Sequence, residues 1–435
     1  MAYRDLDIRL SSESKHHFVA SALEDGKPVA SNSFELRSDE LKVIERLKEL
    51  ETAAEKPESQ VTFHRDFGQE LYGKVFAGEL GSYFQKQLDS NGDGLRISLQ
   101  FDDDSQWLST LPWEFLHDGE DFLVARRKTL ISRMPSKMNR VQSAPLESVL
   151  RMLVIVSAPQ DPSCAPLDTE KERDRILQAV DKLYVQQKLE VDFTDDATFE
   201  TIQSYLNEKD YHIVHFTGHG NEVDGEGYLA LENENLTVNM VGNQAIADLF
   251  AERGIRLVVL SACKSADLAG RLVRKGVPAV VAMQYSILDT SATGFAFAFY
   301  QSLASGRAID LSLTEARLAM RNAKGSNKID FATPVLYLLD PDCLHTGRIK
   351  PVSVDLFQKP VMLGDIQVMR EGFVGRQKEL RFLQKTLLSG SKRAVIVHGW
   401  GGIGKTVMAS RLALRMTRHF EGFFGHKCHA QTRPE

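Results

Sequence analysis

Short apolar runs alternate with stretches of helical spacing through the middle of the chain, from about residue 150 to residue 338. Residues 152–156 are apolar at every position, as expected of a strand that is buried on both faces. Apolar side chains then recur at helical spacing over 176–183. Five further runs resemble buried strands: 189–193, 212–216, 256–260, 279–283 and 335–338. Strands that alternate with helices predict an α/β fold, with a mostly parallel six-stranded sheet and helices on both faces.

The residues before this unit have a mixed pattern. Residues 41–50 carry apolar side chains at helical spacing, 94–100 alternate like a half-buried strand, and 122–125 are strand-like. We therefore expect an α+β N-terminal region over 1–145, followed by the α/β unit over 146–345.

The pattern changes again near residue 346. Residues 346–365, with Pro351 and Pro360, have the composition of a linker. Beyond them, 393–397 is one more strand-like run, a glycine-rich loop follows, and 407–416 fits a helix. This order predicts the start of a further domain over 366–435.

Composition narrows the class of protein. A chain of 435 residues exceeds one ordinary domain. A formal net charge of −6 gives no support for a nucleic-acid or anionic-membrane partner, and no apolar run approaches the roughly 20 residues of a membrane helix. Four scattered cysteines and the lack of a signal-peptide pattern indicate a reducing compartment. We expect a soluble, cytoplasmic protein.

Two of the predicted strands run directly into reactive side chains. The run 212–216 is followed by His219, and the run 256–260 by Cys263, 44 positions after the histidine. Functional groups of open α/β sheets gather beyond the carboxyl ends of the strands. If the two strands are neighbours, the imidazole and the thiol lie on the same rim.

A thiol beside an imidazole is the arrangement of a cysteine nucleophile with its general base. The imidazole raises the thiolate fraction and later protonates the leaving amine. Gly218 and Gly220 would let the backbone turn sharply beside the histidine. The backbone amides of Gly220 and Cys263 would then form an oxyanion hole.

Each of these residues also has a simpler interpretation. A cysteine that ends a core strand is more often an inert buried thiol, and a histidine between glycines can be an ordinary loop residue. The two motifs together, in this order and on predicted parallel strands, favour a cysteine peptidase. Cys164, in a polar loop, and Cys343, after the last strand, lack a glycine-flanked histidine beside them.

The segments HFTGHG (215–220) and VVLSACKS (258–265) resemble the two signatures of CHAT domains, which are caspase-like peptidases related to separases and caspases. LPWE at 111–114 and FY at 299–300 extend this resemblance over roughly residues 1–345. The chain departs from the pattern at Ala266, since many relatives carry glycine two or three residues after the cysteine.

The resemblance implies a caspase-like fold with a His219–Cys263 dyad that needs no cofactor. It also implies a site-specific endopeptidase, regulated by attached sensor modules and often used in bacterial defence. The expected partner is a protein substrate, for example a genetically linked effector such as a bacterial gasdermin. No constellation of arginines suggests an aspartate at P1, in contrast to caspases.

Residues after the next strand along the chain, 279–283, would be placed to line the substrate cleft. These are Gln284, Tyr285 and Asp289. Asp289 would select a basic P1 residue by charge pairing, but it also fits the N-cap of a helix that begins at Thr290.

The sequence GWGGIGKT at 399–406 fits the phosphate-binding P-loop, because it follows a predicted strand and precedes a predicted helix. The predicted phosphate-binding residues are Gly399, Gly401, Gly402, Gly404, Lys405 and Thr406, with Thr406 on Mg²⁺. The expected cofactors of a complete module are ATP or ADP and Mg²⁺.

The segment FVGRQKEL at 373–380 resembles the entry motif of STAND and NB-ARC NTPases, in which it lines the base pocket. This resemblance assigns Arg376 to nucleotide binding and implies oligomerisation through the full NTPase. Because the sequence given ends at Glu435, we expect the NTPase module to be incomplete in it.

Two other patterns resemble metal sites, and neither leads us to predict one. Residues 89–94 open like an EF-hand loop, but position twelve is Gln100 in place of the bidentate glutamate. His426, Cys428 and His429 lie together near the end of the sequence and favour a loop.

The leading hypothesis is a site-specific cysteine endopeptidase that is gated by a STAND-type nucleotide switch. One alternative is a catalytically silent caspase-like scaffold that passes a signal to partners. Another is a nucleotide switch in which the caspase-like part only oligomerises.

Overall fold

The computed structural model describes most of the chain. The described residues are 3–36, 57–90, 94–135, 137–186, 188–223, 226–285, 289–323, 329–345, 361–364, 376–390, 392, 394–416, 419–420 and 422–426. The predicted helix at 41–50 and residues 91–93 of the EF-hand-like loop lie outside these residues.

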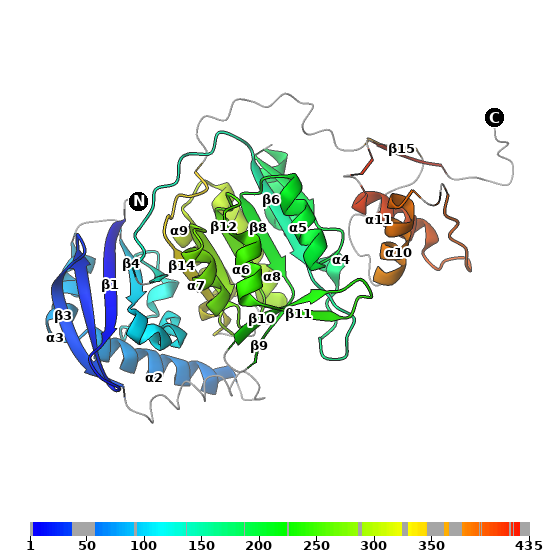
Figure 1. Cartoon of the computed structure of the whole chain (residues 1–435). Coiled ribbons are helices and arrows are strands. Elements are labelled where there is room, and N and C mark those ends of the chain that lie inside the picture. The colour runs from blue at the N-terminus through cyan, green and yellow to red at the C-terminus, as the bar shows by residue number, and fades with distance from the viewer. Residues whose placement is uncertain are drawn as a thin grey trace.

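All six predicted central strands are present and adjacent in one sheet (Figure 1). Their order is β7-β6-β8-β12-β13-β14, and they are parallel except at β13–β14. The predicted α/β fold class, with a large and mostly parallel sheet, is therefore confirmed. The bounds are β6 (Leu150–Val156), β7 (Leu189–Phe193), β8 (Ile213–Thr217), β12 (Leu257–Ser261), β13 (Ala279–Met283) and β14 (Pro334–Leu338).

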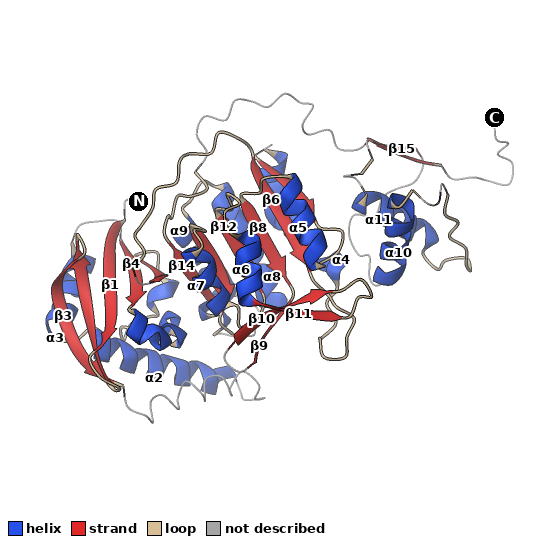
Figure 2. Cartoon of the chain, viewed as in Figure 1, coloured by secondary structure: helices blue, strands red, loops and turns tan. Residues whose placement is uncertain are grey.

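Helices cover both faces of this sheet (Figure 2). One apolar core joins the sheet to α5 (Phe199–Glu208), α6 (Asn243–Phe250) and α7 (Ala266–Arg274). A second core, on the other face, contains α4 (Thr169–Val185), α8 (Asp289–Ala304) and α9 (Ile309–Asn322). Strands buried on both sides explain the continuous apolar runs in the sequence. None of the helices described is long and apolar enough to cross a membrane.

The N-terminal region extends the same sheet, which has eleven strands in total. Its strand β5 pairs in parallel with β14 through Arg133 and Tyr337. The elements are β1 (Arg4–Ser12), β2 (His17–Glu24), β3 (Lys27–Glu35), α2 (Pro57–Val75), α3 (Gly78–Asp89), β4 (Leu95–Phe101), η1 (Asp103–Thr110), η2 (Trp113–Phe115), η3 (Leu123–Ala125) and β5 (Thr129–Pro135).

The strand predicted at 122–125 is wrong, because these residues form the short 3-10 helix η3. Its three residues are all buried, so the apolar run reflects burial of a tight turn. A run of only four apolar residues is compatible with a strand and also with a buried turn.

A small antiparallel sheet lies beyond the carboxyl end of β8. It consists of β9 (His219–Val223), β10 (Glu226–Glu232) and β11 (Val238–Gly242), in the order β11-β10-β9. β9 follows β8 after a single residue, so the chain leaves the large sheet directly into the small one. The short helix η4 (Asp330–Ala332) precedes β14.

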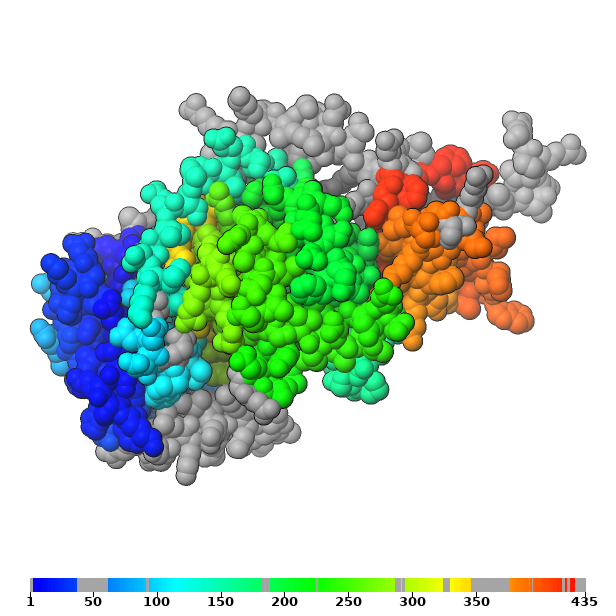
Figure 3. Space-filling model, viewed as in Figure 1, coloured from blue at the N-terminus to red at the C-terminus, as the bar shows by residue number. Residues whose placement is uncertain are grey.

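The C-terminal part contributes α10 (Gln377–Leu388) and α11 (Lys405–Arg415), which pack against the body next to the small sheet (Figure 3). β15 (Val361–Gly364), at the end of the predicted linker, pairs in parallel with β16 (Gly422–Gly425). The predicted helix at 407–416 is thus confirmed as part of α11.

The strand predicted at 393–397 does not form over the residues described there, 394–397. The side chain of Ile396 is 86% exposed. A central parallel strand needs neighbours on both sides, and within the described part of the chain β15 and β16 pair only with each other. The apolar run at 394–397 therefore forms no strand.

Candidate active site

The strands that carry the two candidate residues are direct neighbours. β8 and β12 pair in parallel, and their last matched residues are Thr217 and Ser261. His219 follows two residues after Thr217, and Cys263 two residues after Ser261. Both side chains are partly exposed at the rim of the sheet. The structure therefore brings together the two residues that the sequence singled out.

The backbone of the histidine segment touches the backbone of the cysteine turn. A Cβ atom on Gly220 would lie 2.1 Å from the carbonyl oxygen of Cys263. Glycine is thus the only residue that fits at position 220 without a shift of the chain. Neither Gly218 nor Gly220 has a positive φ, so the sharp turn expected from these glycines is not their role. Close approach, and not backbone freedom, requires Gly220.

A backbone carbonyl orients the imidazole of His219. The Nε2 atom lies 2.8 Å from the carbonyl oxygen of Ala165, in the loop between β6 and α4. A carbonyl only accepts, so Nε2 carries the proton and Nδ1 keeps the free electron pair. No hydrogen bond joins this ring to Cys263 Sγ in the structure. Ala165 could not be identified from the sequence, because it lies 54 positions before His219 and no local pattern links the two residues.

The turn after Cys263 is held by Ser265. Its amide donates to the carbonyl of Met283 at 2.9 Å, and its hydroxyl donates to the carbonyl of Ala262 at 2.8 Å. The amide of Met283 donates to the same hydroxyl at 3.1 Å. Lys264 adopts a left-handed conformation with φ of 55°, a strained state for a non-glycine residue. The departure from the family pattern has no consequence for the turn, because Ala266 is the first residue of α7.

A buried chain of hydrogen bonds joins His215, Thr217 and Tyr300, just before the rim residue His219 in the sequence. His215 Nδ1 lies 2.7 Å from Tyr300 Oη, and Nε2 lies 3.0 Å from Thr217 Oγ1. Burial lowers the pKa of His215 to about 4 and raises the pKa of Tyr300 well above its usual range. His215 is therefore neutral and structural, although it belongs to the same motif as His219.

We expect acid to destabilise the fold through His215. Its folded pKa of about 4 lies below the ordinary 6.5, so the contribution is complete above pH 6.5 and is lost as the pH falls toward 4. Between pH 7.5 and pH 5, His215 should lower the free energy of unfolding by about 2 kcal/mol. Urea unfolding at pH 7.5 and at pH 5 gives the free energy of unfolding at each pH. The decrease from pH 7.5 to pH 5 should be smaller in His215→Asn than in the wild type. Exposed His17→Asn is the control, and equal losses in all three proteins would contradict the assignment.

Two of the residues predicted to line the substrate cleft, Gln284 and Tyr285, contact buried residues of the core. Gln284 Nε2 donates to Glu114 Oε2 at 3.1 Å and to the carbonyl of Ala332 at 2.8 Å. Tyr285 stacks on Phe115, with ring centroids 6.4 Å apart. Asp289 is the first residue of α8, and its side chain lies outside the described part. These contacts give Gln284 and Tyr285 an evident packing role.

Glu114, within the LPWE segment, forms a buried ion pair with Arg133. Each side chain is 1% exposed. Arg133 also donates to the carbonyl of Ser109 at 2.6 Å and to Gln284 Oε1 at 3.2 Å. This network connects the N-terminal region with the end of β13. No motif or periodicity of the sequence pointed to Arg133.

The predicted nucleotide residues lie around the start of α11. Lys405 Nζ donates back to the carbonyls of Gly399 and Trp400 at 2.9 and 2.8 Å. Arg376 Nη2 donates to the carbonyl of Ile403 at 2.9 Å, so the two predicted motifs are in contact. Among the glycines of this loop, Gly399, Gly402 and Gly404 have a positive φ.

The remaining thiols differ in accessibility. Cys343 is buried, and desolvation raises its pKa, so it is an inert core thiol. Cys164 is partly exposed and immediately precedes Ala165. Within the ranges that the structure covers, no group of three His, Cys, Asp or Glu side chains could hold a metal ion. Cys428 and His429 lie outside those ranges.

Comparisons with known proteins give one strong match and several distant ones. In fold the chain is similar to the Arg-specific cysteine proteinase gingipain R (16% identity, TM-score 0.44, 62% of this chain and 69% of that chain). It is also similar to a chain of the Saccharomyces cerevisiae separase–securin complex (11%, 0.47, 77% and 30%) and to the Drosophila initiator caspase Dronc (10%, 0.32, 48% and 87%). No curated protein sequence matches the chain. The family model of the CHAT domain matches residues 65–361, well over half of the sequence, and the chain therefore belongs to the CHAT-domain family.

Proposed function

We propose that this protein is a cysteine endopeptidase in which Cys263 is the nucleophile and His219 the general base. The observation that carries the proposal is the contact between the two rim segments, in which Gly220 lies against the carbonyl of Cys263. The hydrogen bond from His219 to Ala165 adds the third group that orients a catalytic base.

The steps follow from the roles of these atoms. His219 Nδ1 takes the proton of the Cys263 thiol, and the thiolate attacks the scissile carbonyl carbon. Collapse of the tetrahedral intermediate breaks the C–N bond, and the imidazolium gives its proton to the leaving amine. Water, deprotonated by the same imidazole, then hydrolyses the thioester and restores the thiol. The Ala165 carbonyl keeps Nε2 protonated, so that Nδ1 remains the base.

The negative charge on the substrate oxygen requires donors on the same rim. We assign the backbone amides of Gly220 and Cys263 to this oxyanion hole, because they belong to the two segments in contact. The substrate is an extended segment of a protein partner, which would lie across the rim at the carboxyl ends of β8 and β12.

A library of fluorogenic peptides tests the proposal with the purified chain. We expect discrete cleavage products, and their loss when iodoacetamide modifies Cys263, as mapped by mass spectrometry. A silent scaffold, the alternative from another class, would give no cleavage with any peptide and slow alkylation of Cys263.

We further propose that the P-loop segment binds nucleotide and gates the peptidase. The residues fit phosphate groups, because a glycine loop with positive φ angles leads into the N-terminus of α11. A Cβ atom on Gly401, Gly402 or Gly404 would meet no atom within 4 Å, so the loop is open on that side. A cavity of about 530 Å³, lined by Arg376, Phe382 and His398 among others, adjoins it. Bound nucleotide would supply the phosphate charges that Lys405 and Thr406 recognise.

Lys405→Ala should weaken nucleotide binding by about tenfold or more, because a charge-assisted contact to phosphate is lost. Calorimetric titration with a non-hydrolysable ATP analogue measures the effect. Lys392→Ala, a neighbouring exposed lysine, should bind like the wild type. Equal affinities in all three proteins would remove Lys405 from the phosphate site.

A further inference from the structure

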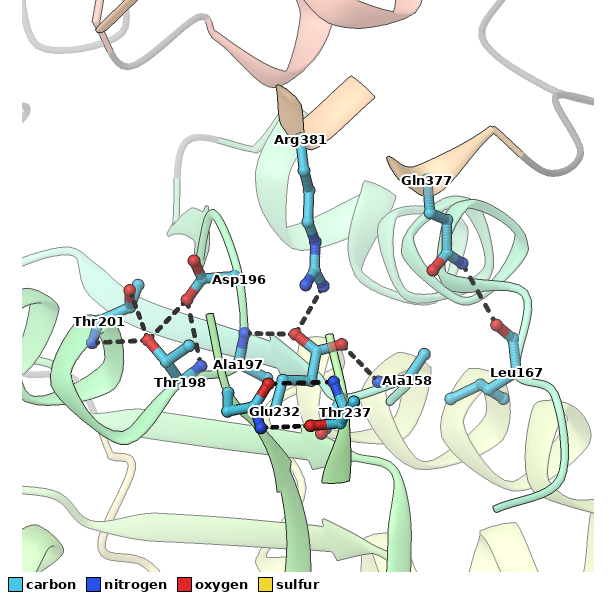
Figure 4. A network of polar contacts seen from close by, with 12 residues as sticks. Ala158, Leu167, Asp196, Ala197, Thr198, Thr201, Glu232, Thr237, Gln377 and Arg381 are labelled. Atoms are coloured by element: carbon cyan, nitrogen blue, oxygen red, sulfur yellow. Dashed lines mark hydrogen bonds and ion pairs between the residues drawn. The ribbon is translucent and has the colours of Figure 1, made fainter. Parts of the chain in front are cut away.

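Arginines of the two C-terminal helices reach carboxylates that are buried in the caspase-like body. Arg381 of α10 pairs with Glu232 at 2.5 Å, and Figure 4 shows its side chain extending from the helix to this carboxylate. Arg411 and Arg415 of α11 both pair with Glu170. The side chains of Glu232 and Glu170 are 0% exposed.

Glu232 connects two loops of the body. Its carboxylate accepts from the amide of Ala158 at 2.9 Å and from the amide of Ala197 at 3.0 Å. The third contact is the guanidinium of Arg381, so the charge of Glu232 is compensated from the C-terminal helices. A buried carboxylate that loses its cation carries a large desolvation penalty.

Glu170 is held in the same way at the start of α4. Burial alone would raise its pKa, but the charges of Arg415, Arg173 and Arg411 bring the pKa below the usual value. Arg411 also donates to Asp174 at 2.7 Å, one turn further along α4. The first turns of α4 are therefore anchored to α11.

These contacts surround the loop that orients His219. Residues 157–168 connect β6 to α4, and Ala165 lies within them. Near the start of the loop, the carboxylate of Glu232 accepts from the amide of Ala158 (Figure 4). Near the end of the loop, Gln377 of α10 donates to the carbonyl of Leu167 at 3.3 Å. Ala165, whose carbonyl accepts from His219, thus lies between Ala158 and Leu167. Arg381 of α10 reaches Ala158 only through Glu232, whereas Gln377 of α10 contacts Leu167 directly. α11 contacts Glu170, just after the loop.

We infer that α10 and α11 act as a clamp on the 157–168 loop and thereby position His219 for catalysis. The clamp consists of Gln377, Arg381, Arg411 and Arg415, which are positioning residues. This inference rests on the proposed peptidase function. Docking of the helices favours the productive orientation of the imidazole. Their release frees the end of the loop at Leu167 and removes the cation from Glu232, the carboxylate that holds the start of the loop at Ala158.

The same helix connects the clamp to the proposed nucleotide site. α11 begins at Lys405, on the P-loop, and ends at Arg415, on Glu170. A displacement of α11 by a ligand at its N-terminus would act directly on the ion pairs at its other end. A ligand shifts such an equilibrium only through its different affinity for the two states.

The test removes the ion pairs at α4 with Arg411→Met and Arg415→Met together. We expect kcat on a cleaved peptide to fall about tenfold or more with KM nearly unchanged, since misplaced catalytic groups lose rate and not binding. Lys385→Ala, an exposed lysine of α10, is the matched control and should keep the wild-type values. The conservative pair Arg411→Lys and Arg415→Lys should recover part of the loss. Unchanged or increased kcat in the methionine variant would overturn the clamp.

A second readout does not depend on any peptide substrate. The rate at which iodoacetamide modifies Cys263, mapped across pH 6 to 8, reports how well His219 supports the thiolate. The clamp variant should move toward the profile of His219→Ala, and a wild-type profile would contradict the inference. If no peptide is cleaved by the wild type, the peptidase proposal fails, while this profile still decides the clamp. Arg381→Met, which breaks only the contact to Glu232, gives the same comparison if the double variant does not fold.

Discussion

Replacing Cys263 by alanine should abolish peptide cleavage, and replacing His219 by alanine should reduce its rate by a factor of about 10² to 10⁴. Without the thiol no acyl intermediate forms, and residual hydrolysis rests on binding and oxyanion stabilisation alone. Without the imidazole the thiolate fraction falls and the leaving amine receives no proton, for which losses of about 10² to 10⁴ are usual.

Both substitutions should leave the fold intact. Cys263 and His219 are partly exposed at the rim, and His219 loses one hydrogen bond, to an exposed loop. Substitutions of this kind change stability by about 1 kcal/mol or less. Melting temperatures close to the wild type would therefore accompany the loss of activity.

The measurement is kcat/KM on the best library peptide, with circular dichroism as the check on folding. Cys164→Ala is the matched control, because this thiol is also partly exposed and lies beside Ala165. It should retain most of the activity. Cleavage that persists in Cys263→Ala, or is lost in Cys164→Ala alone, would refute the assignment of the nucleophile.

Gly220→Ala should have the second largest effect, a fall in kcat of about 100-fold or more. The new Cβ atom would lie 2.1 Å from the carbonyl oxygen of Cys263, a contact that real structures do not contain. Either the cysteine turn or β9 has to move, and these segments carry the two proposed catalytic residues, Cys263 and His219. A displacement near 1 Å is enough for a loss of this size.

Gly294→Ala provides the comparison, since a Cβ atom at this helical glycine would meet nothing within 4 Å. It should keep wild-type activity and gain a little stability, because alanine favours a helix over glycine by about 1 kcal/mol. A Gly220→Ala protein that folds and cleaves at the wild-type rate would show that the two segments do not approach each other as described.

The extent to which local pattern predicted this molecule varies along the chain. All six central strands lie where apolar runs occur, because a strand buried on both faces is apolar at every position. The pattern failed at 122–125, where a buried turn has the same composition. It also failed at 394–397, where none of the described strands pairs with these residues. Burial is visible in a sequence, whereas the partner that satisfies the backbone is not.

The candidate site shows the same division. The placement of His219 and Cys263 on one rim followed from the sequence, because parallel strands that end together bring their next residues together. The reason why position 220 requires glycine could not be predicted from the sequence. A clash with the carbonyl of Cys263 depends on the packing of two segments that are distant in the chain.

By itself, then, the sequence determined the fold class, the family signatures and the two reactive residues at the ends of adjacent strands. Tertiary structure alone decided that the carbonyl of Ala165 bonds to His219 and that Arg381, Arg411 and Arg415 pair with buried carboxylates. Arg411 and Glu170 are 241 positions apart, and a pair at this separation cannot be predicted from the periodicity of the sequence. Periodic patterns arise from one element facing one environment, while these contacts exist only after separate elements have packed.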